Sequence, residues 1–212
     1  MRVMGTSLAA DSGRPATSRA ERLSPNLPID DRIEPEDAEA LARIAVGDSG
    51  ALRVAFVRHW AAVARAALRV AGDFDDARDA AQEAFIRLYV RPPSVDTPLR
   101  AWLCRVATNE AVNALRSGRR RVAREGRHLA AVNAAATDEI AEANLSAERA
   151  LVRETLLALS ARSRDLLVLR AEGFRYFEIA TALGVAPGSV GTLLVRAEQA
   201  FREGYEARRG GA

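Results

Sequence analysis

The sequence predicts an all-α protein, and three observations lead to this fold class. The chain has 212 residues, of which 49% are hydrophobic and only 5% aromatic. Alanine and leucine make up most of the hydrophobic residues. Alanine and leucine favour helices, whereas aromatic and β-branched residues favour strands. No stretch alternates between apolar and polar residues as a half-buried strand does. Apolar residues instead recur every three or four positions between glycine and proline breaks, which is typical of amphipathic helices.

The N-terminal part is expected to begin with an unstructured leader. Residues 1–34 are rich in Ser, Pro, Gly, Ala and Arg without any period, a composition that does not bury a core. A short helix is predicted from Pro35 to about Val46, because proline at a first-turn position is followed by acidic residues. Gly47 breaks this helix.

A longer helix follows, with Asp48 or Ser49 as its cap and Gly72 as its stop. Its predicted buried face consists of Leu52, Phe56, Trp60, Val63, Ala67 and Val70.

The next two helices are separated by a loop held between prolines. The first begins at Asp73–Asp75 and ends at Pro92, with an apolar face of Ala77, Ala80, Ala81, Ala84, Phe85 and Leu88. The loop "RPPSVDTP" then leads to a helix from about Pro98 to Arg116.

The composition changes after this helix, so two small helical domains are expected. The first domain is predicted to cover residues 35–118, and an arginine- and alanine-rich linker residues 119–145. The second domain is predicted over residues 146–208.

The second domain contains the spacing of a helix-turn-helix. Counted from Tyr176, Ala180 falls at the fifth position, where two crossing helices need a small residue, and Gly184 at the ninth, where the turn needs positive φ. The shared core is predicted to hold Ile179, Leu183, Val185 and Val190. An αα-hairpin that serves stability alone is the alternative.

The second helix of this motif carries few groups that read DNA. Its exposed candidates are Ser189, Thr192 and Arg196, with Arg175 ahead of the first helix. Gly191, Leu193 and Val195 stand where a stronger reader carries Arg, Lys or Asn. Such weak contacts do not give a tight complex alone, so a second binding element on the same chain is expected.

Two polar faces in the first domain are candidates for that element. Asp76, Asp79, Gln82 and Glu83 form a stripe that is either a solvated helix face or a docking face for a basic partner. In the helix after the loop, Arg105, Asn109, Asn113 and Arg116 share one face, and Arg and Asn are the residues that read guanine and adenine. Arg119 and Arg120 would contact phosphates, and a loop with Ser94, Asp96 and Thr97 could hold an unpaired base.

These motifs, in this order, resemble the extracytoplasmic-function sigma factors, the small two-domain sigma subunits of bacterial RNA polymerase. The matching stretches are "DARDAAQEAFIRLY", "PLRAWLCRVATNEAVNAL" and "LLALSARSRDLLVLRAEGFRYFEIATALGVAPGSVGTLLVRA". The resemblance implies a promoter-recognition subunit that binds core polymerase and promoter DNA and has an anti-sigma factor as a candidate partner.

The same resemblance implies roles for single residues. Asp76, Asp79, Gln82 and Glu83 match the face that docks on the polymerase clamp helices. Residues 94–97 match the pocket for a flipped base of the −10 element, and Arg105, Asn109 and Asn113 match the helix at the upstream edge of that element. The second domain would read the −35 element. In this family an acid is common at the position of Asn113, and basic residues are common at the positions of Gly191, Leu193 and Val195.

Composition excludes several other classes. With one cysteine, Cys104, no internal disulfide can form, and two distant histidines make no metal site, so neither metal nor cofactor is expected. No catalytic group is predicted, and Cys104 is predicted to be a core thiol.

The net charge is only +3, and all 31 basic residues are arginine, which reflects either base composition or a preference for guanidinium at phosphates. No signal peptide or membrane span is apparent, which predicts a cytoplasmic protein.

Two further functions remain as alternatives. One is a stand-alone helix-turn-helix repressor or activator, although such a protein needs neither the acidic stripe nor the separate Arg/Asn face. The other is an interaction protein that has kept this shape but lost DNA binding, which only the charge-poor second helix favours.

Overall fold

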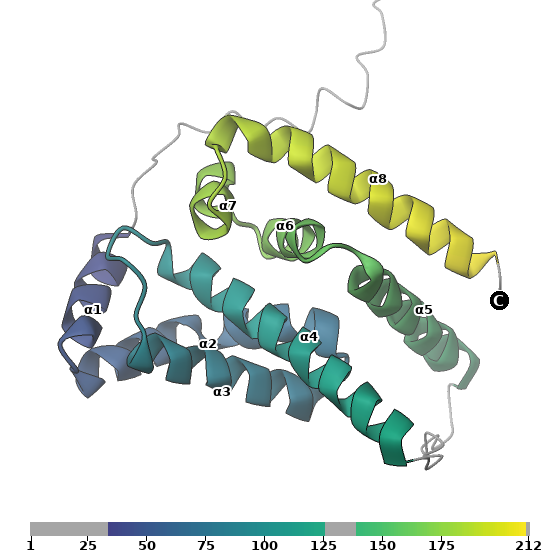
Figure 1. Ribbon diagram of the computed structural model, residues 1–212, viewed down its shortest axis with the longest axis horizontal. Helices are drawn as coiled ribbons and strands as arrows, with labels where there is room; N and C mark the ends of the chain where they lie inside the picture. Colours follow the sequence, from purple (N-terminus) through teal and green to yellow (C-terminus); the bar gives the residue numbers. More distant parts are fainter. Residues whose placement is uncertain (1–33, 126–138, 211–212) are drawn as a thin grey trace, which may run out of the picture. The chain divides into compact units, whose positions relative to one another are not determined.

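The computed structural model describes residues 34–125 and 139–210, with the backbone alone described for 118–125 and 139–145. Every regular element in these ranges is helical, which confirms the all-α prediction (Figure 1). The expected leader lies outside the described residues apart from its last position, Glu34.

Four helices form the N-terminal bundle: α1 (Pro35–Ala45), α2 (Ser49–Ala71), α3 (Phe74–Val90) and α4 (Leu99–Glu125). Their ends follow the local signals in the sequence. The Asp48 side chain accepts hydrogen bonds from the backbone N–H groups of Gly50 and Ala51, and Asp73 caps α3 in the same way. Gly72 ends α2 with a φ of 76°, which favours glycine.

The bundle core is built mainly from small residues. Where α2, α3 and α4 meet, completely buried alanines lie between larger apolar side chains; we call this the alanine seam, formed by Ala66, Ala67, Ala81, Ala84, Ala101 and Ala107 with Val63, Val70, Leu88, Leu99 and Leu103. Alanine lets helix backbones approach closely, so the face of α2 that carries its alanines is the face that is buried. The prediction that Phe56 is buried was therefore wrong: its side chain is 36% exposed.

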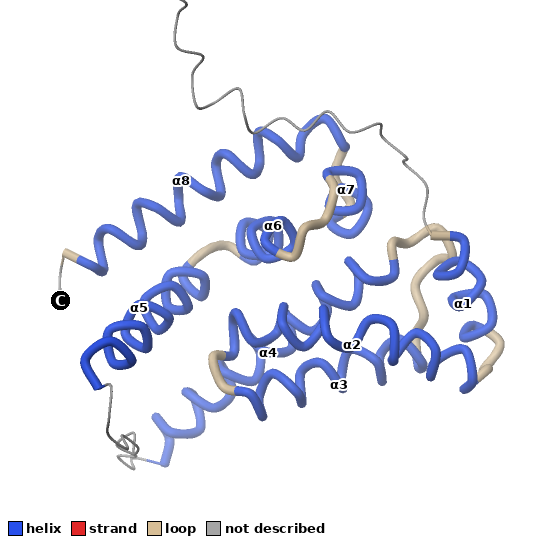
Figure 2. The backbone as a smooth tube through the Cα atoms, turned by 180° about the vertical axis from the view of Figure 1, so that it is seen from behind, coloured by secondary structure: helices blue, strands red, loops and turns tan. Residues whose placement is uncertain are grey.

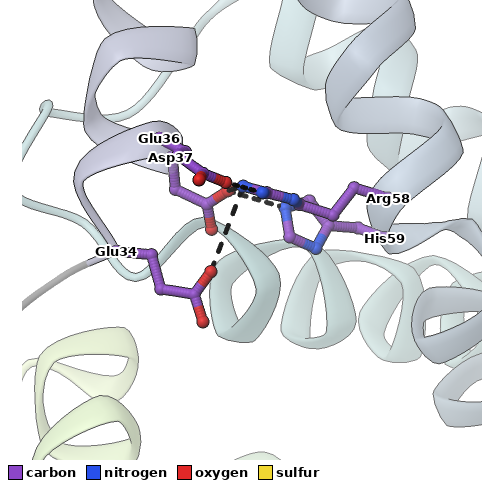
Figure 3. A network of polar contacts seen from close by, with 5 residues as sticks. All are labelled: Glu34, Glu36, Asp37, Arg58 and His59. Carbon is purple, nitrogen blue, oxygen red and sulfur yellow. Dashed lines mark hydrogen bonds and ion pairs between the residues drawn. The ribbon is translucent and has the colours of Figure 1, made fainter.

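A buried polar contact fixes α1 on α2 (Figure 3). His59 Nε2 lies 2.9 Å from Asp37 Oδ1, and both side chains are buried. Arg58 contacts the same carboxylate and pairs with Glu36. A buried carboxylate needs such partners, so this network holds the short first helix in place.

The C-terminal bundle consists of α5 (Glu139–Ala158), α6 (Ala161–Ala171), α7 (Tyr176–Leu183), the short 3₁₀ helix η2 (Pro187–Ser189) and α8 (Val190–Arg209) (Figures 1 and 2). Ser160 caps α6 by accepting a hydrogen bond from the backbone N–H of Ser163. Helices α4 and α5 extend into both ends of the expected linker, whose residues 126–138 lie outside the described ranges.

The helix-turn-helix forms where its spacing predicts. Gly184 has a φ of 65°, Ala180 is buried, and α7 meets the segment Pro187–Arg209 at 108°. Ile179 and Val190 are completely buried, while Leu183 and Val185 pack half-buried against the same core. In the part of the chain that the structure describes, no single helix has the length and apolarity to cross a membrane, and this bent pair meets the criterion only when its two arms are taken together.

Candidate functional site

The acidic stripe of α3 lies beside an open apolar groove. Asp76, Asp79 and Gln82 are exposed and Glu83 is half-buried. Between α2 and α3 runs a groove of about 540 Å³, lined by the polar residues Ser49, Arg53 and Gln82 and by Leu52, Phe56, Phe85, Ile86 and Tyr89. Gln82 belongs to both features, so the polar stripe and the groove make one continuous surface.

Aromatic contacts give this groove a defined floor. The Phe56 ring stacks on Trp60 with 4.8 Å between centroids and lies 4.9 Å from the Phe85 ring. Ile86 and Tyr89, at 55% and 45% exposure, form its rim. A contiguous exposed apolar surface of this kind marks an interaction site. Sequence reasoning missed it because Phe56 was assigned to the core; the signal was Ile86 and Tyr89, which lie off the buried stripe of α3.

The loop before α4 is a short turn between prolines. The backbone N–H of Thr97 donates to the Ser94 carbonyl at 2.9 Å, and the N–H of Asp96 lies 3.4 Å from Ser94 Oγ. Ser94 and Asp96 are exposed and Thr97 is half-buried. The loop therefore presents its polar groups to solvent directly ahead of α4.

The predicted Arg/Asn face of α4 is divided in two. Asn113 and Arg116 are exposed, whereas Arg105 and Asn109 are half-buried. Arg105 Nη1 donates to the Ala182 carbonyl of α7 at 2.6 Å, and Arg105 Nε lies 3.5 Å from Asp165 Oδ2 of α6. The side chains of Arg119 and Arg120 lie outside the described part of α4.

Asp165 belongs to a buried charged cluster that the sequence did not reveal. We define the α4–α6 contact as Arg105 and Asn109 of α4 with Arg164 and Asp165 of α6. Burial raises the pKa of Asp165 to about 6, although Arg105, Arg164 and a hydrogen bond from Asn109 all favour the carboxylate. Burial also lowers the pKa of Arg164, whose side chain is only 1% exposed. Charged residues on a short helix normally face water, so no pattern in α6 indicated their burial.

The candidate DNA-reading groups of the helix-turn-helix face solvent. Ser189, Thr192 and Arg196 are exposed, and the last two share one side of α8. The exposed Arg175 directly precedes α7, where its side chain pairs with Glu178 at 3.4 Å.

The uncharged positions of α8 have different explanations. Leu193 packs against the core and therefore has a structural role. Gly191 faces the Tyr176 ring, which would lie 3.6 Å from an added Cβ. Of these three residues, only Val195 places an exposed apolar side chain where a DNA-contacting residue is expected; it is 63% exposed.

Comparison with known proteins gives the family. The Sigma-70 region 2 model matches residues 55–121, and the Sigma-70 region 4 model matches residues 149–201. The ECF RNA polymerase sigma factor SigL of Mycobacterium tuberculosis is 33% identical over 163 residues, which is 74% of this chain and 90% of that protein. The RNA polymerase sigma-H factor of Pseudomonas aeruginosa is 28% identical over 177 residues, covering 78% and 92% of the two chains.

A solved structure shares the arrangement of the described helices. CnrH, in complex with the cytosolic domain of CnrY, matches with a TM-score of 0.54 and 28% identity over 81% of this chain and 98% of CnrH. The order of the two matched regions and the coverage of the relatives place this chain in the family of ECF RNA polymerase sigma factors, which direct promoter-specific initiation of transcription.

Proposed function

We propose that the chain divides this initiation work among three surfaces and carries out no chemistry of its own. The acidic stripe and groove of the N-terminal bundle dock on core RNA polymerase. The loop 94–97 and α4 meet the −10 element, and α8 meets the −35 element. Because its work is done on the polymerase, the protein acts in the cytoplasm.

The exposed groove is the observation that carries the docking assignment. Large apolar side chains are normally withdrawn from water, yet Phe56, Ile86 and Tyr89 stay open on one face. The stripe with Asp76 and Asp79 adds negative charge beside them, which favours a partner with basic residues around an apolar ridge. A solvated helix face would need no such groove.

Docking on polymerase also explains the weak recognition helix. Ser189, Thr192 and Arg196 offer few base or phosphate contacts. When polymerase holds both bundles over one promoter, each contact acts at high effective concentration, so the assembly is tight although each site is weak. The −35 element is therefore read by a modest set of contacts within a large complex.

A protein regulator is the remaining expected partner. CnrH was solved with the cytosolic domain of CnrY bound to it. By analogy we infer that a small regulatory protein, an anti-sigma factor, binds this chain and competes with polymerase for it. Purified chain immobilised in a lysate of its source organism should retain this protein, and added core polymerase should displace it.

The docking assignment is tested by charge reversal. We would measure binding of the purified chain to bacterial core polymerase for Asp79→Arg combined with Gln82→Arg. The expected result is a loss of affinity of at least about tenfold, since like charges now face the basic partner. Glu206→Arg, on the exposed side of α8, is the matched control and should bind as the wild type does. Unchanged binding of the double variant would remove the docking role from α3.

The promoter assignment needs a separate readout. Genomic fragments transcribed only when this chain is added to core polymerase define its promoters. On such a promoter, Asn113→Ala should slow DNA opening, followed by the fluorescence of a base analogue in the −10 element, and leave polymerase binding unchanged. Asn113 is the suitable position because its side chain is exposed. An unchanged opening rate would mean that this part of α4 does not meet the −10 element.

A further inference from the structure

One face of α8 is uncharged where this helix is expected to meet DNA. Thr192 and Val195 lie three residues apart on the exposed side of α8, and Gly188 in η2 precedes them. We propose that this face reads the −35 element through the C5-methyl groups of thymine, and that Thr192 and Val195, which we call the methyl-reading pair, contact these groups. The proposal rests on the proposed function, which brings α8 to the −35 element.

Thymine is the base that an apolar side chain recognises in DNA. In the major groove every base presents hydrogen-bonding groups, but only thymine adds a C5-methyl group. Val195 carries two methyl groups and no polar side-chain atom, and Thr192 carries a methyl group beside its hydroxyl. Against any other base edge, Val195 would cover a donor or acceptor and give it no partner, which is unfavourable. The chemistry of the pair therefore selects thymine.

The start of the helix lets DNA come close enough for this contact. Valine and threonine are short, so they reach base edges only when the helix backbone lies deep in the major groove. Gly188 is exposed, and a Cβ added to it would have no described atom within 4 Å, so the space in front of it is open. Gly191, half-buried beside the Tyr176 ring, also lacks a side chain. A long side chain at either glycine would hold the helix away from the bases.

The charges of α8 limit how far along the helix the contact extends. Gln199 lies on the same face as the methyl-reading pair, and its Nε2 donates to Glu203 Oε1 at 3.0 Å. Glu203 and Glu206 continue this line, flanked by Arg202, and their carboxylates repel phosphates. The exposed Arg196, beside the pair, is placed to hold a phosphate. The contact therefore ends near Gln199, with the methyl-reading pair at its centre.

Helix geometry adds an expectation about the promoter itself. Three residues of α-helix rise by about 4.5 Å, which is close to the spacing of about 3.4 Å between stacked base pairs. The methyl-reading pair therefore contacts neighbouring base pairs. Arginines at these positions would select guanine, whereas this chain selects thymines, on either strand, at two adjacent positions of the −35 element.

The test removes the methyl groups and leaves the base pairs intact. Uracil pairs with adenine as thymine does but has no C5-methyl group. On a promoter defined by the selection described above, the thymines of the −35 element are replaced by uracil, and equilibrium binding of the complex of core polymerase and this chain is measured. We expect a loss of about fourfold in affinity for each contacted methyl group. The same replacement between the −35 and −10 elements should leave the affinity unchanged.

Variants of the methyl-reading pair assign the effect to its residues. Val195→Ala and Thr192→Ser remove methyl groups from the protein side, so each should bind the thymine promoter less tightly and distinguish less between thymine and uracil. Both side chains are exposed, so the helix-turn-helix core is not disturbed. Val54→Ala on α2 is the matched control, because Val54 is 61% exposed and Val195 63%. It should keep the full ratio of the two affinities.

The outcomes distinguish this inference from the proposed function. Equal affinity for the thymine and uracil promoters, in a complex that initiates transcription, would overturn methyl reading and leave the proposed function standing. Selected −35 elements without thymine would do the same. Uracil sensitivity that both Val195→Ala and Thr192→Ser retain in full would remove the assignment to these residues. If the chain supports no initiation with core polymerase, the proposed function fails and this inference fails with it.

Discussion

Helix α4 takes part in two buried layers of opposite character. One side enters the alanine seam with α2 and α3, where Ala101, Leu103 and Ala107 are completely buried among apolar neighbours. The other side makes the α4–α6 contact, in which the buried side chains are charged and several of their polar atoms lack partners. Burial alone therefore does not make an interface permanent. Exposing the first layer to water would hydrate only apolar side chains, which is unfavourable, whereas exposing the second would give its unpaired polar atoms hydrogen bonds to water.

The largest expected effect comes from breaking the alanine seam. Leu88→Ala removes a completely buried side chain and leaves a cavity, and we expect a loss of about 2–5 kcal/mol in the free energy of unfolding. Urea denaturation followed by circular dichroism measures it. Ile86→Ala, two positions away and 55% exposed, is the control and should lose far less. Equal losses would mean that the seam is not the stabilising layer of the bundle.

Acidification should strengthen the α4–α6 contact. The pKa of Asp165 is raised from 3.8 to about 6 where α4 and α6 meet, so the chain with this contact formed binds a proton that it releases when the contact breaks. The α4–α6 contact is therefore favoured as the pH falls below about 6 and is weakened as the pH rises through that value. The groups that face Asp165 are Arg105 and Asn109 of α4 and Arg164 of its own helix. We expect the chain to unfold at a higher urea concentration at about pH 5 than at about pH 7.5 through this contact.

The control for this pH dependence is Asp165→Asn, which has no proton to exchange. Its urea midpoint should differ less between the two pH values. A pH response that survives in this variant would assign the titration to another group and separate Asp165 from the opening equilibrium.

A smaller effect tests whether the two bundles unfold independently. Gly184 has a φ of 65° in the helix-turn-helix, so Gly184→Ala should cost the C-terminal bundle about 1–2 kcal/mol. Because the α4–α6 contact is weak, we expect this loss in only one part of the chain. Amide hydrogen exchange should rise in α7 and α8 and stay unchanged in α2 and α3. Faster exchange in both bundles would show that the contact couples their stability and is not readily separable.

The smallest expected signal is the reactivity of the single native thiol. Burial, and after it the negative charge of Glu172, raises the pKa of Cys104 to about 12. The charges that act on it, from Glu172, Arg100 and Arg65, all lie where the two bundles meet. We therefore expect very slow reaction with a disulfide reagent in the wild type and a modest acceleration in Glu172→Arg. No acceleration, in a variant shown to be folded by circular dichroism, would place the thiol wholly within the alanine seam.

Local chemistry made most of the fold predictable. Capping by Asp48 and Asp73, the stop at Gly72 and the turn at Gly184 each depend on a few neighbouring residues, so their types alone indicated the helix ends. The helix-turn-helix and the core position of Cys104 were predicted for the same reason. The assignments of residues to polymerase, the −10 element and the −35 element stay predictions, as do the domain boundaries.

What escaped prediction depends on contacts between distant segments. Periodicity placed Phe56 in the core, because the sequence does not show that alanines would bring α2 and α3 so close that the larger ring is left at the edge. It gave no indication that Arg164 and Asp165 are buried, because their burial is decided by α4, about sixty positions away in the sequence. The groove and the α4–α6 contact are therefore properties of the assembled helices.

The alanine seam also bears on the order in which the protein is made. An alanine side chain has no rotamers to lose, so closing this layer costs little side-chain entropy, and its three helices are joined by short connections. The apolar residues that α2, α3 and α4 bury together have all been synthesised by about Val112, while α6 is still to come. The N-terminal bundle can therefore fold on the ribosome before Asp165 exists. A newly made chain would expose Arg105 and Asn109 first and close over them only when translation reaches its end.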